Sequence, residues 1–226
     1  MPAPSLSPSV EDYLKAIYGL CEGGDPASTS SIAEALQVQP ASVTGMVKRL
    51  AGSGLLEHVP YRGVRLTAKG AREALRVVRR HRVIESFLCE HLGYAWDDVH
   101  EEAERLEHAA SEELVERMAA ALSSPGHDPH GAPIPTRSGH IEVTDLATLA
   151  DALPGTSVRI RAVRDEDPER LRSMKAAGLV PGATLRVDPG PPEERSTAVV
   201  VDGEGGETFS VDHEMARHIY VVPSED

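Results

Sequence analysis

The pattern of apolar residues changes once along this chain, at a segment rich in proline and glycine, and this change constrains the fold more than any other feature. Residues 123–139 contain four prolines and three glycines, which is typical of a linker. Before this segment, apolar residues recur at helical spacing, as in Tyr13, Leu14 and Ile17. After it, apolar and polar residues alternate, as in the run 158–161. The sequence therefore predicts a mainly α front part followed by a small all-β barrel.

Within the front part, two short helices and a ribbon are predicted in succession. Residues 31–36 and 40–50 each carry apolar residues on one side, as two helices packed on each other would. Residues 55–60 and 64–66 can pair as strands around the turn at 61–63. This order is that of a winged helix–turn–helix, whose second helix enters the major groove of DNA. The alternative is an ordinary three-helix subdomain, or one that contacts proteins. The side chains predicted to face DNA are small, polar or basic: Gln39, Pro40, Ala41, Ser42, Thr44, Lys48 and Arg62.

The net charge of −13 argues at first against binding to nucleic acid, but the charge is unevenly distributed. Residues 1–82 carry 11 Lys and Arg against 7 Asp and Glu, a net of +4, whereas residues 83–226 carry 12 against 29, a net of −17. Because salt screens charges over about 8–10 Å, the local charge decides whether a phosphate is attracted. The front part can therefore follow a DNA backbone, and the acidic remainder can bind cations or face solvent.

The segment 100–108 places potential metal ligands along one side of a predicted helix. His81 and Glu85, four residues apart, share one face of the preceding helix. Packing these faces together would bury uncompensated charge, which a divalent cation would neutralise. The alternative is a solvated acidic helix face. The potential ligands of the segment, at positions i, i+4, i+7 and i+8, are His100, Glu104, Glu107 and His108.

The kinds of ligand indicate which metals such a site would prefer. Carboxylates and imidazoles without a thiolate suit manganese or ferrous iron, and zinc, cobalt or cadmium can bind as surrogates. The donor types therefore predict Mn²⁺ or Fe²⁺ and leave the choice between the two open.

Motifs of catalysis are absent from the chain. His100-Glu101 is followed by Glu104 and not by a histidine, so the HExxH zinc motif is missing. Arg105 lies three residues before His108, so the Glu-x-x-His motif of di-iron bundles is missing as well. We therefore expect no enzymatic activity and no small-molecule substrate.

The compartment is predicted from what the sequence lacks. The two cysteines, Cys21 and Cys89, are far apart in the chain, which argues against a disulfide framework or a thiolate zinc site. No stretch approaches the roughly 20 apolar residues of a membrane span. Residues 1–9 lack the pattern of a secretory signal. These features predict a cytoplasmic protein with no membrane partner.

Five segments, in this order, resemble the diphtheria toxin repressor family of metal-dependent regulators, which includes iron-dependent and manganese-transport branches. The likeness covers essentially the whole chain, and its C-terminal part is similar to the SH3-like, FeoA-type domain of longer members. The segments are 9–14, 43–47 with 61–63, 80–82, 100–108 and 129–135.

The resemblance implies two metal sites. Asp12 and Glu104 stand where iron-type members carry Met and Cys, so the implied primary site is similar to that of manganese-type members. Lys15 stands where those members carry a second glutamate of the first helix, which leaves the number of bound ions open. The implied primary site consists of Asp12, Glu104, Glu107 and His108, and the implied second site of His81, Glu85 and His100.

Together these observations predict a winged helix–turn–helix domain at 1–75, a helical metal-binding and dimerisation domain at 76–140, and an SH3-like domain at 150–226. The predicted function is that of a homodimeric repressor of metal-uptake genes, which binds a palindromic operator in double-stranded DNA with Mn²⁺ or Fe²⁺ as corepressor. The alternative is a metal-binding interaction protein whose barrel recruits a partner and whose DNA binding does not respond to metal.

Overall fold

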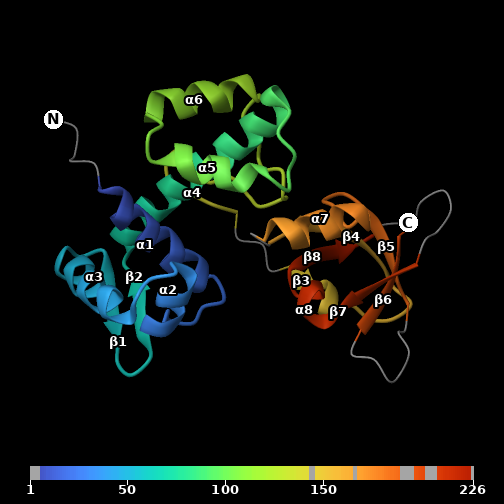
Figure 1. Cartoon of the computed structure of the whole chain (residues 1–226), viewed down its shortest axis with the longest axis horizontal. Helices are drawn as coiled ribbons and strands as arrows, with labels where there is room; N and C mark the ends of the chain where they lie inside the picture. The colour runs from blue at the N-terminus through green and yellow to red at the C-terminus, as the bar shows by residue number, and fades with distance from the viewer. Residues whose placement is uncertain (1–5, 143–145, 165–166, 189–195, 202–207, 225–226) are drawn as a thin grey trace. The chain divides into compact units, whose positions relative to one another are not determined.

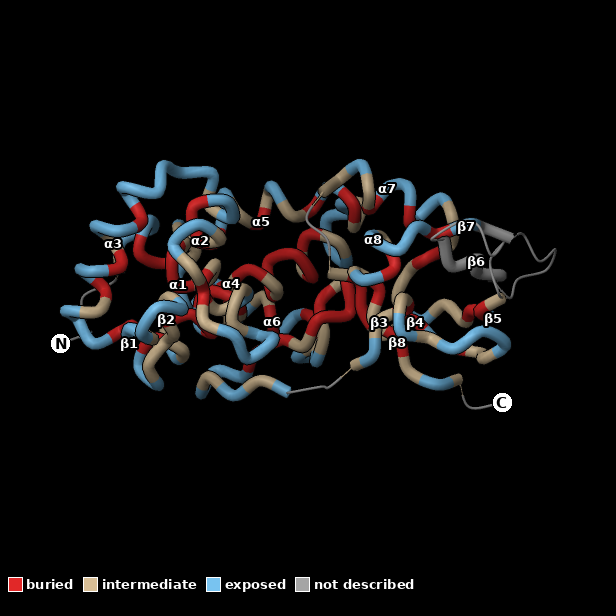
Figure 2. The backbone as a smooth tube through the Cα atoms, turned by 90° about the horizontal axis from the view of Figure 1, so that it is seen from below, coloured by how far each residue is buried: buried red, intermediate tan, exposed pale blue. Residues whose placement is uncertain are grey.

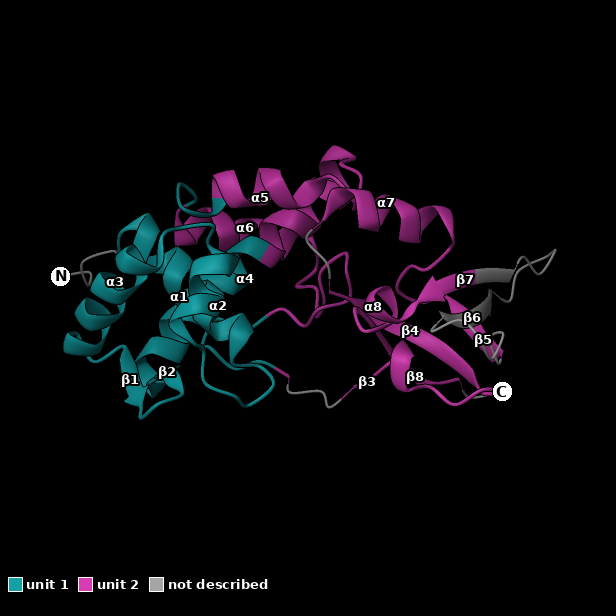
Figure 3. Cartoon of the chain, turned by 60° about the horizontal axis from the view of Figure 1, so that its bottom comes forward, with its two compact units in different colours: residues 1–81, 107–110, 135–141 teal, residues 82–106, 111–134, 142–226 magenta. Residues whose placement is uncertain are grey.

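Most helices lie in the N-terminal part of the chain, up to Ala121, and most strands lie after it, as the change of pattern predicts (Figure 1). The computed structural model describes residues 6–142, 146–164, 167–188, 196–201 and 208–224. The chain divides into two compact units, each of which gathers segments that are distant in sequence (Figure 3). The predicted domain boundaries stay a prediction. Unit 1 contains residues 1–81, 107–110 and 135–141, and unit 2 contains residues 82–106, 111–134 and 142–226.

Unit 1 contains the predicted winged helix–turn–helix. Ser28 begins the second helix, because its side chain accepts a hydrogen bond from the backbone N–H of Ser31. The two strands pair antiparallel, with Leu56 opposite Leu66. The elements are α1 (Pro8–Leu20), α2 (Thr29–Ala35), α3 (Pro40–Gly52), β1 (Leu56–Val59) and β2 (Gly63–Leu66).

These helices share one apolar core. Leu14 and Ile17 of α1, Ile32 of α2, and Val43 and Leu50 of α3 are all at most 2% exposed. Burial of one such side chain contributes roughly 1.5–3 kcal/mol, and close-packed interiors resist local rearrangement. We therefore expect α1 and α3 to move together rather than independently.

Three further helices follow: α4 (Ala68–Leu92), α5 (Val99–Glu107) and α6 (Glu112–Ala121). The sequence also predicts helix caps at Thr67 and Ser111, and both are confirmed, since Thr67 Oγ1 accepts from Gly70 N at 3.1 Å and Ser111 Oγ accepts from Leu114 N at 3.2 Å. The sequence also predicts a helix that begins at Trp96, but this helix begins at Val99, after a turn. Among the described residues, no helix has the length and apolarity needed to cross a membrane.

The β part is one antiparallel sheet with strand order β3-β8-β4-β5-β6-β7, which agrees with the predicted small barrel. Alternation follows the prediction on β4, where Val158 and Ile160 are buried and Arg159 is exposed. The sequence also predicts a turn at Asp202-Gly203, and these two residues lie outside the described part of the chain. The elements are β3 (Ala147–Thr148), η1 (Leu149–Asp151), β4 (Ser157–Val163), α7 (Pro168–Ala176), β5 (Thr184–Asp188), β6 (Ser196–Val201), β7 (Thr208–Asp212), α8 (His213–Ala216) and β8 (Ile219–Pro223).

The alternating pattern does not predict α7, whose signals are local. Asp167 Oδ1 accepts from the backbone N–H of Glu169 at 2.8 Å, and Pro168 occupies the first turn, where its missing N–H has no cost. Leu171 and Met174 of α7 are fully buried in the core of the barrel. The side chain of Asp167 therefore acts as the N-terminal cap of α7.

Within unit 2, the barrel contacts the start of α5 and the proline-rich segment. Lys175 Nζ of α7 lies 2.7 Å from Asp97 Oδ1, and this aspartate is only 5% exposed. The backbone N–H of Val163 donates to the carbonyl of His130 at 2.8 Å. The segment predicted to be a linker is therefore held against β4 of the barrel.

Candidate functional site

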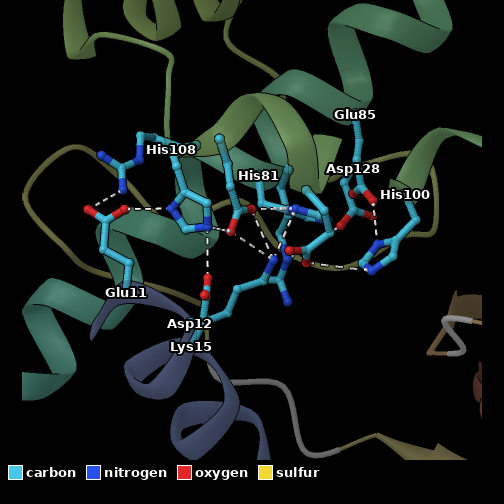
Figure 4. Close-up of polar contacts among 12 residues, drawn as sticks. Glu11, Asp12, Lys15, His81, Glu85, His100, His108 and Asp128 are labelled. Atoms are coloured by element: carbon cyan, nitrogen blue, oxygen red, sulfur yellow. Dashed lines mark hydrogen bonds and ion pairs between the residues drawn. The ribbon is translucent and has the colours of Figure 1, made fainter. Parts of the chain in front are cut away.

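Three side chains of unit 1 that can bind a metal converge at α1. Asp12 lies on α1, Glu107 is the last residue of α5, and His108 follows it. Asp12 Oδ1 lies 2.7 Å from His108 Nε2, and Glu107 Oε1 lies 3.6 Å from the same nitrogen (Figure 4). One ligand atom from each of the three lies within 4.8 Å of the other two. Two carboxylates and an imidazole at this spacing form a set of donors for a divalent cation.

Glu107 is fully buried and has two basic neighbours. Lys15 Nζ lies 3.0 Å from Glu107 Oε2, and His81 Nδ1 lies 2.6 Å from the same oxygen. Burial raises the pKa of the Glu107 carboxyl, but the hydrogen bond with His81 and the positive charge of Lys15 outweigh this effect, so the pKa is below its usual range. The carboxylate is therefore ionised at neutral pH and carries the negative charge that a cation site needs.

Glu11, which sequence reasoning did not select, orients His108. Its Oε2 lies 2.8 Å from His108 Nδ1, and its Oε1 lies 2.6 Å from Arg80 Nη2 on α4. A carboxylate at Nδ1 accepts the proton there and leaves Nε2 directed at Asp12. Burial lowers the pKa of His108, but the hydrogen bond to Glu11 and the charges of Asp12 and Glu107 together raise it above its usual value. The signal in the sequence was the adjacent pair Glu11-Asp12 on one helix.

Unit 2 contains a second cluster, which is buried throughout. Glu85 on α4 is 2% exposed, and Asp128 and His130 of the proline-rich segment are 9% and 8% exposed. One ligand atom from each of the three lies within 4.8 Å of the other two. Burial and the charge of Glu85 raise the pKa of Asp128, although Arg82, with Nε at 3.4 Å, opposes them. Two carboxylates and an imidazole buried this close together form a second set of donors for a divalent cation, with Arg82 as the basic neighbour.

His130 is held so that one ring nitrogen faces this cluster. Its Nε2 lies 2.7 Å from the carbonyl oxygen of Trp96, which can only accept a hydrogen bond. Nε2 therefore donates to this carbonyl, and Nδ1 on the other side of the ring lies 3.9 Å from Glu85 Oε2. The sequence placed His130 and Asp128 in a linker because the segment has neither helical nor strand periodicity. The only signal was the resemblance of the segment 129–135.

The residues predicted for the second site lie in both units. His81, in unit 1, contacts Glu107 and Lys15. In unit 2, His100 Nδ1 lies 3.1 Å from Glu85 Oε1, and His100 Nε2 lies 3.7 Å from Glu104 Oε1 (Figure 4). The grouping of His81 with Glu85 and His100, and of Glu104 with the primary ligands, stays a prediction.

The predicted DNA-facing residues lie on the exposed side of α3 and at the tip of the ribbon. On α3, Val43, Val47 and Leu50 are buried, and the residues between them are mostly exposed (Figure 2). Arg62 pairs with Asp25 Oδ1 at 2.5 Å and keeps 59% of its side chain exposed. The exposed residues of the predicted interface are Gln39, Pro40, Ala41, Ser42, Thr44, Lys48 and Arg62.

Three family profiles match the chain one after another. The profile of the iron-dependent repressor N-terminal DNA-binding domain matches residues 5–64. That of the iron-dependent repressor metal-binding and dimerisation domain matches residues 67–136. That of the FeoA domain matches residues 147–223. The expected resemblance is thereby confirmed.

Individual proteins are similar over half of the chain or more. The iron-dependent repressor IdeR of Mycobacterium leprae (strain TN) is 31% identical, over 96% of this chain and 97% of that protein. The HTH-type transcriptional regulator MntR of Oceanobacillus iheyensis is 41% identical, over 50% of this chain and 76% of that protein. A manganese-dependent transcriptional repressor, solved in complex with manganese, aligns with a TM-score of 0.88 and 35% identity, over 95% of this chain and all (100%) of that one.

Proposed function

We propose a metal-controlled function for this chain, which belongs to the iron-dependent repressor family. Members of this family are DNA-binding transcriptional regulators and not enzymes. In the proposal, Asp12, Glu107 and His108 bind the metal that controls DNA binding. The observation that carries the proposal is the convergence of these three side chains within 4.8 Å. Glu104 is included as a fourth ligand on the strength of the sequence. The alternative of an interaction protein is not favoured, because a repressor, IdeR, matches this chain over 96% of its length, the barrel included.

We propose manganese as the metal. The donors are two carboxylates and an imidazole, and hard oxygen ligands suit Mn²⁺, whereas a thiolate or thioether would favour softer ions. Both cysteines are free thiols that belong to neither cluster. The relatives named above comprise an iron-dependent and a manganese-dependent repressor, so Fe²⁺ is the competing ion.

The position of Asp12 connects metal binding to DNA binding. Asp12 lies on α1, which shares an apolar core with the exposed helix α3. When Asp12, Glu107 and His108 bind one ion, α1 is fixed to the residues that follow α5, and α3 is fixed with it. The metal then favours one orientation of α3, and DNA and metal strengthen each other's binding by the same factor. A dimerisation domain supports a homodimer, for which we propose a palindromic operator and action in the cytoplasm.

A second ion is proposed at Glu85, Asp128 and His130. The support is the burial of two carboxylates beside a histidine whose Nδ1 faces them, with one ligand atom of each within 4.8 Å of the others. A divalent cation there would offset the cost of burying both charges. Because the backbone of His130 is hydrogen-bonded to β4, this ion would also stabilise the contact between the barrel and α4.

The proposed function is tested by DNA binding with and without metal. Duplexes would first be selected from random DNA by the full chain loaded with Mn²⁺, and one of them labelled for fluorescence anisotropy. We expect Mn²⁺ to lower the Kd for this duplex by about 5- to 150-fold relative to excess chelator, which is the usual range of coupling between two sites. An affinity that is equal in Mn²⁺, Fe²⁺ and chelator would overturn the proposal.

Glu11 is predicted to be a positioning residue for His108. Replacing it with alanine removes the acceptor at Nδ1, and loss of such an outer-shell partner costs about 10- to 100-fold in metal affinity. Glu11→Gln keeps an acceptor oxygen and should cost less. The measurement is the Kd for Mn²⁺ by electron paramagnetic resonance, with the exposed Glu34→Ala on α2 as control. Equal affinities in Glu11→Ala and Glu34→Ala would remove Glu11 from this role.

A further inference from the structure

Lys15 lies among groups that are otherwise typical of a metal site. Its Nζ is 3.0 Å and 3.2 Å from the two oxygens of Glu107, and 3.1 Å from His81 Nδ1 (Figure 4). The lysine side chain is 20% exposed and the glutamate side chain is fully buried. All three residues belong to unit 1. An ammonium group thus occupies a position that a carboxylate and an imidazole surround.

Glu107 therefore faces two positions for a cation. On one side, its Oε1 lies 3.6 Å from His108 Nε2, the nitrogen that also contacts Asp12. On the other side, the ammonium of Lys15 lies 3.0 Å from Oε2 and 3.2 Å from Oε1, and His81 Nδ1 lies 2.6 Å from Oε2. The first position is that of the proposed regulatory ion, and the second holds a charge that is covalently attached to α1.

We propose that Lys15 acts as a tethered second cation, which restricts this site to one divalent ion and weakens the binding of that ion by sharing Glu107. The inference rests on the proposed function, because it presupposes an ion at Asp12, Glu107 and His108. The physical reason is charge. A positive charge within several ångströms of a divalent ion in a partly buried site repels it, and a carboxylate shared with an ammonium donates less to the metal.

The first test converts the tethered cation into a ligand. Lys15→Glu places a carboxylate beside Glu107 and His81, which gives three donors around the second position. We expect this variant to bind one more Mn²⁺ per chain than the wild type in equilibrium dialysis with metal analysis. Its electron paramagnetic resonance spectrum should show two coupled manganese ions. Lys69→Glu, which makes the same charge change at an exposed position of α4, should keep the wild-type count.

The second test removes the charge without adding a ligand. Lys15→Gln should tighten Mn²⁺ binding at the regulatory site roughly tenfold or more, because the repulsion is lost and Glu107 becomes available to the ion. Lys15→Arg keeps the charge and should keep the wild-type count of ions. Thermal unfolding of the metal-free variants, followed by circular dichroism, establishes that each one is folded.

The outcomes distinguish this inference from the proposed function. A wild-type chain that binds no Mn²⁺ in dialysis overturns the proposed function itself. A wild-type chain that binds Mn²⁺, with no added ion in Lys15→Glu and no tighter binding in Lys15→Gln, overturns the role of Lys15 alone. If Lys15→Glu does not fold, the affinity of Lys15→Gln for Mn²⁺ tests the inference. An affinity equal to or weaker than that of the wild type contradicts it.

Discussion

Replacing Glu107 with alanine is expected to abolish the response of DNA binding to Mn²⁺. Glu107 is the only one of the three converging ligands that is fully buried, and both of its oxygens contact charged or imidazole groups. The Kd for Mn²⁺ should rise by more than the roughly 10- to 100-fold that loss of an outer-shell partner costs. In anisotropy titrations, the variant with Mn²⁺ should bind the selected duplex as the wild type does with chelator.

The fold should survive this change, because Lys15 keeps 20% of its side chain exposed and can reach solvent once Glu107 is gone. Glu107→Gln, which preserves volume, provides a second variant if the alanine leaves a disruptive cavity. Glu113→Ala on α6 removes an exposed carboxylate and serves as the matched control. A wild-type response to Mn²⁺ in folded Glu107→Ala would count against the primary site.

Replacing Gly131 with alanine is expected to release the proline-rich segment from the barrel. Gly131 has φ +83°, and a Cβ atom there would lie 2.2 Å from the carbonyl oxygen of Arg161 and 2.9 Å from Ala162 Cα, both on β4. An L side chain at this φ costs roughly 1–3 kcal/mol, and the backbone contact adds to that cost. The adjacent hydrogen bond from Val163 N to the His130 carbonyl should break, and His130 should leave Glu85 and Asp128.

Two readouts follow from this displacement. Limited proteolysis should cut the variant within 123–142 faster than the wild type, and the count of bound Mn²⁺ should fall by the ion proposed at Glu85. Gly126→Ala makes the same substitution in the same segment, at a position where the new Cβ atom meets no neighbour, and serves as the matched control. Gly155→Ala, with φ +85° and open space, separates backbone strain from steric contact. If Gly131→Ala behaves like Gly126→Ala in both assays, the segment is not held as described.

Regular elements were predicted well because their signals are local. The apolar spacing of α1 and α3, the caps at Thr67 and Ser111, and the alternation on β4 all depend on residues a few positions apart. The helix α7 was missed although its Asp-Pro start is local, because Leu171 and Met174 were the only apolar signal in a short, charged stretch. Periodicity fails where an element is too short to repeat.

The sequence by itself determined the order of the elements, the exposed face of the recognition helix, and the ligand types on α5. Only the tertiary structure decided which partners those ligands meet. Lys15 contacts Glu107 across 92 positions, and Glu11 contacts His108 across 97. Asp128 and His130 become buried only because the irregular segment packs against the barrel. Such contacts depend on packing between distant segments, which no local spacing encodes. That is why the contact of Lys15 with Glu107, and the buried cluster of Glu85, Asp128 and His130, emerged only from the fold.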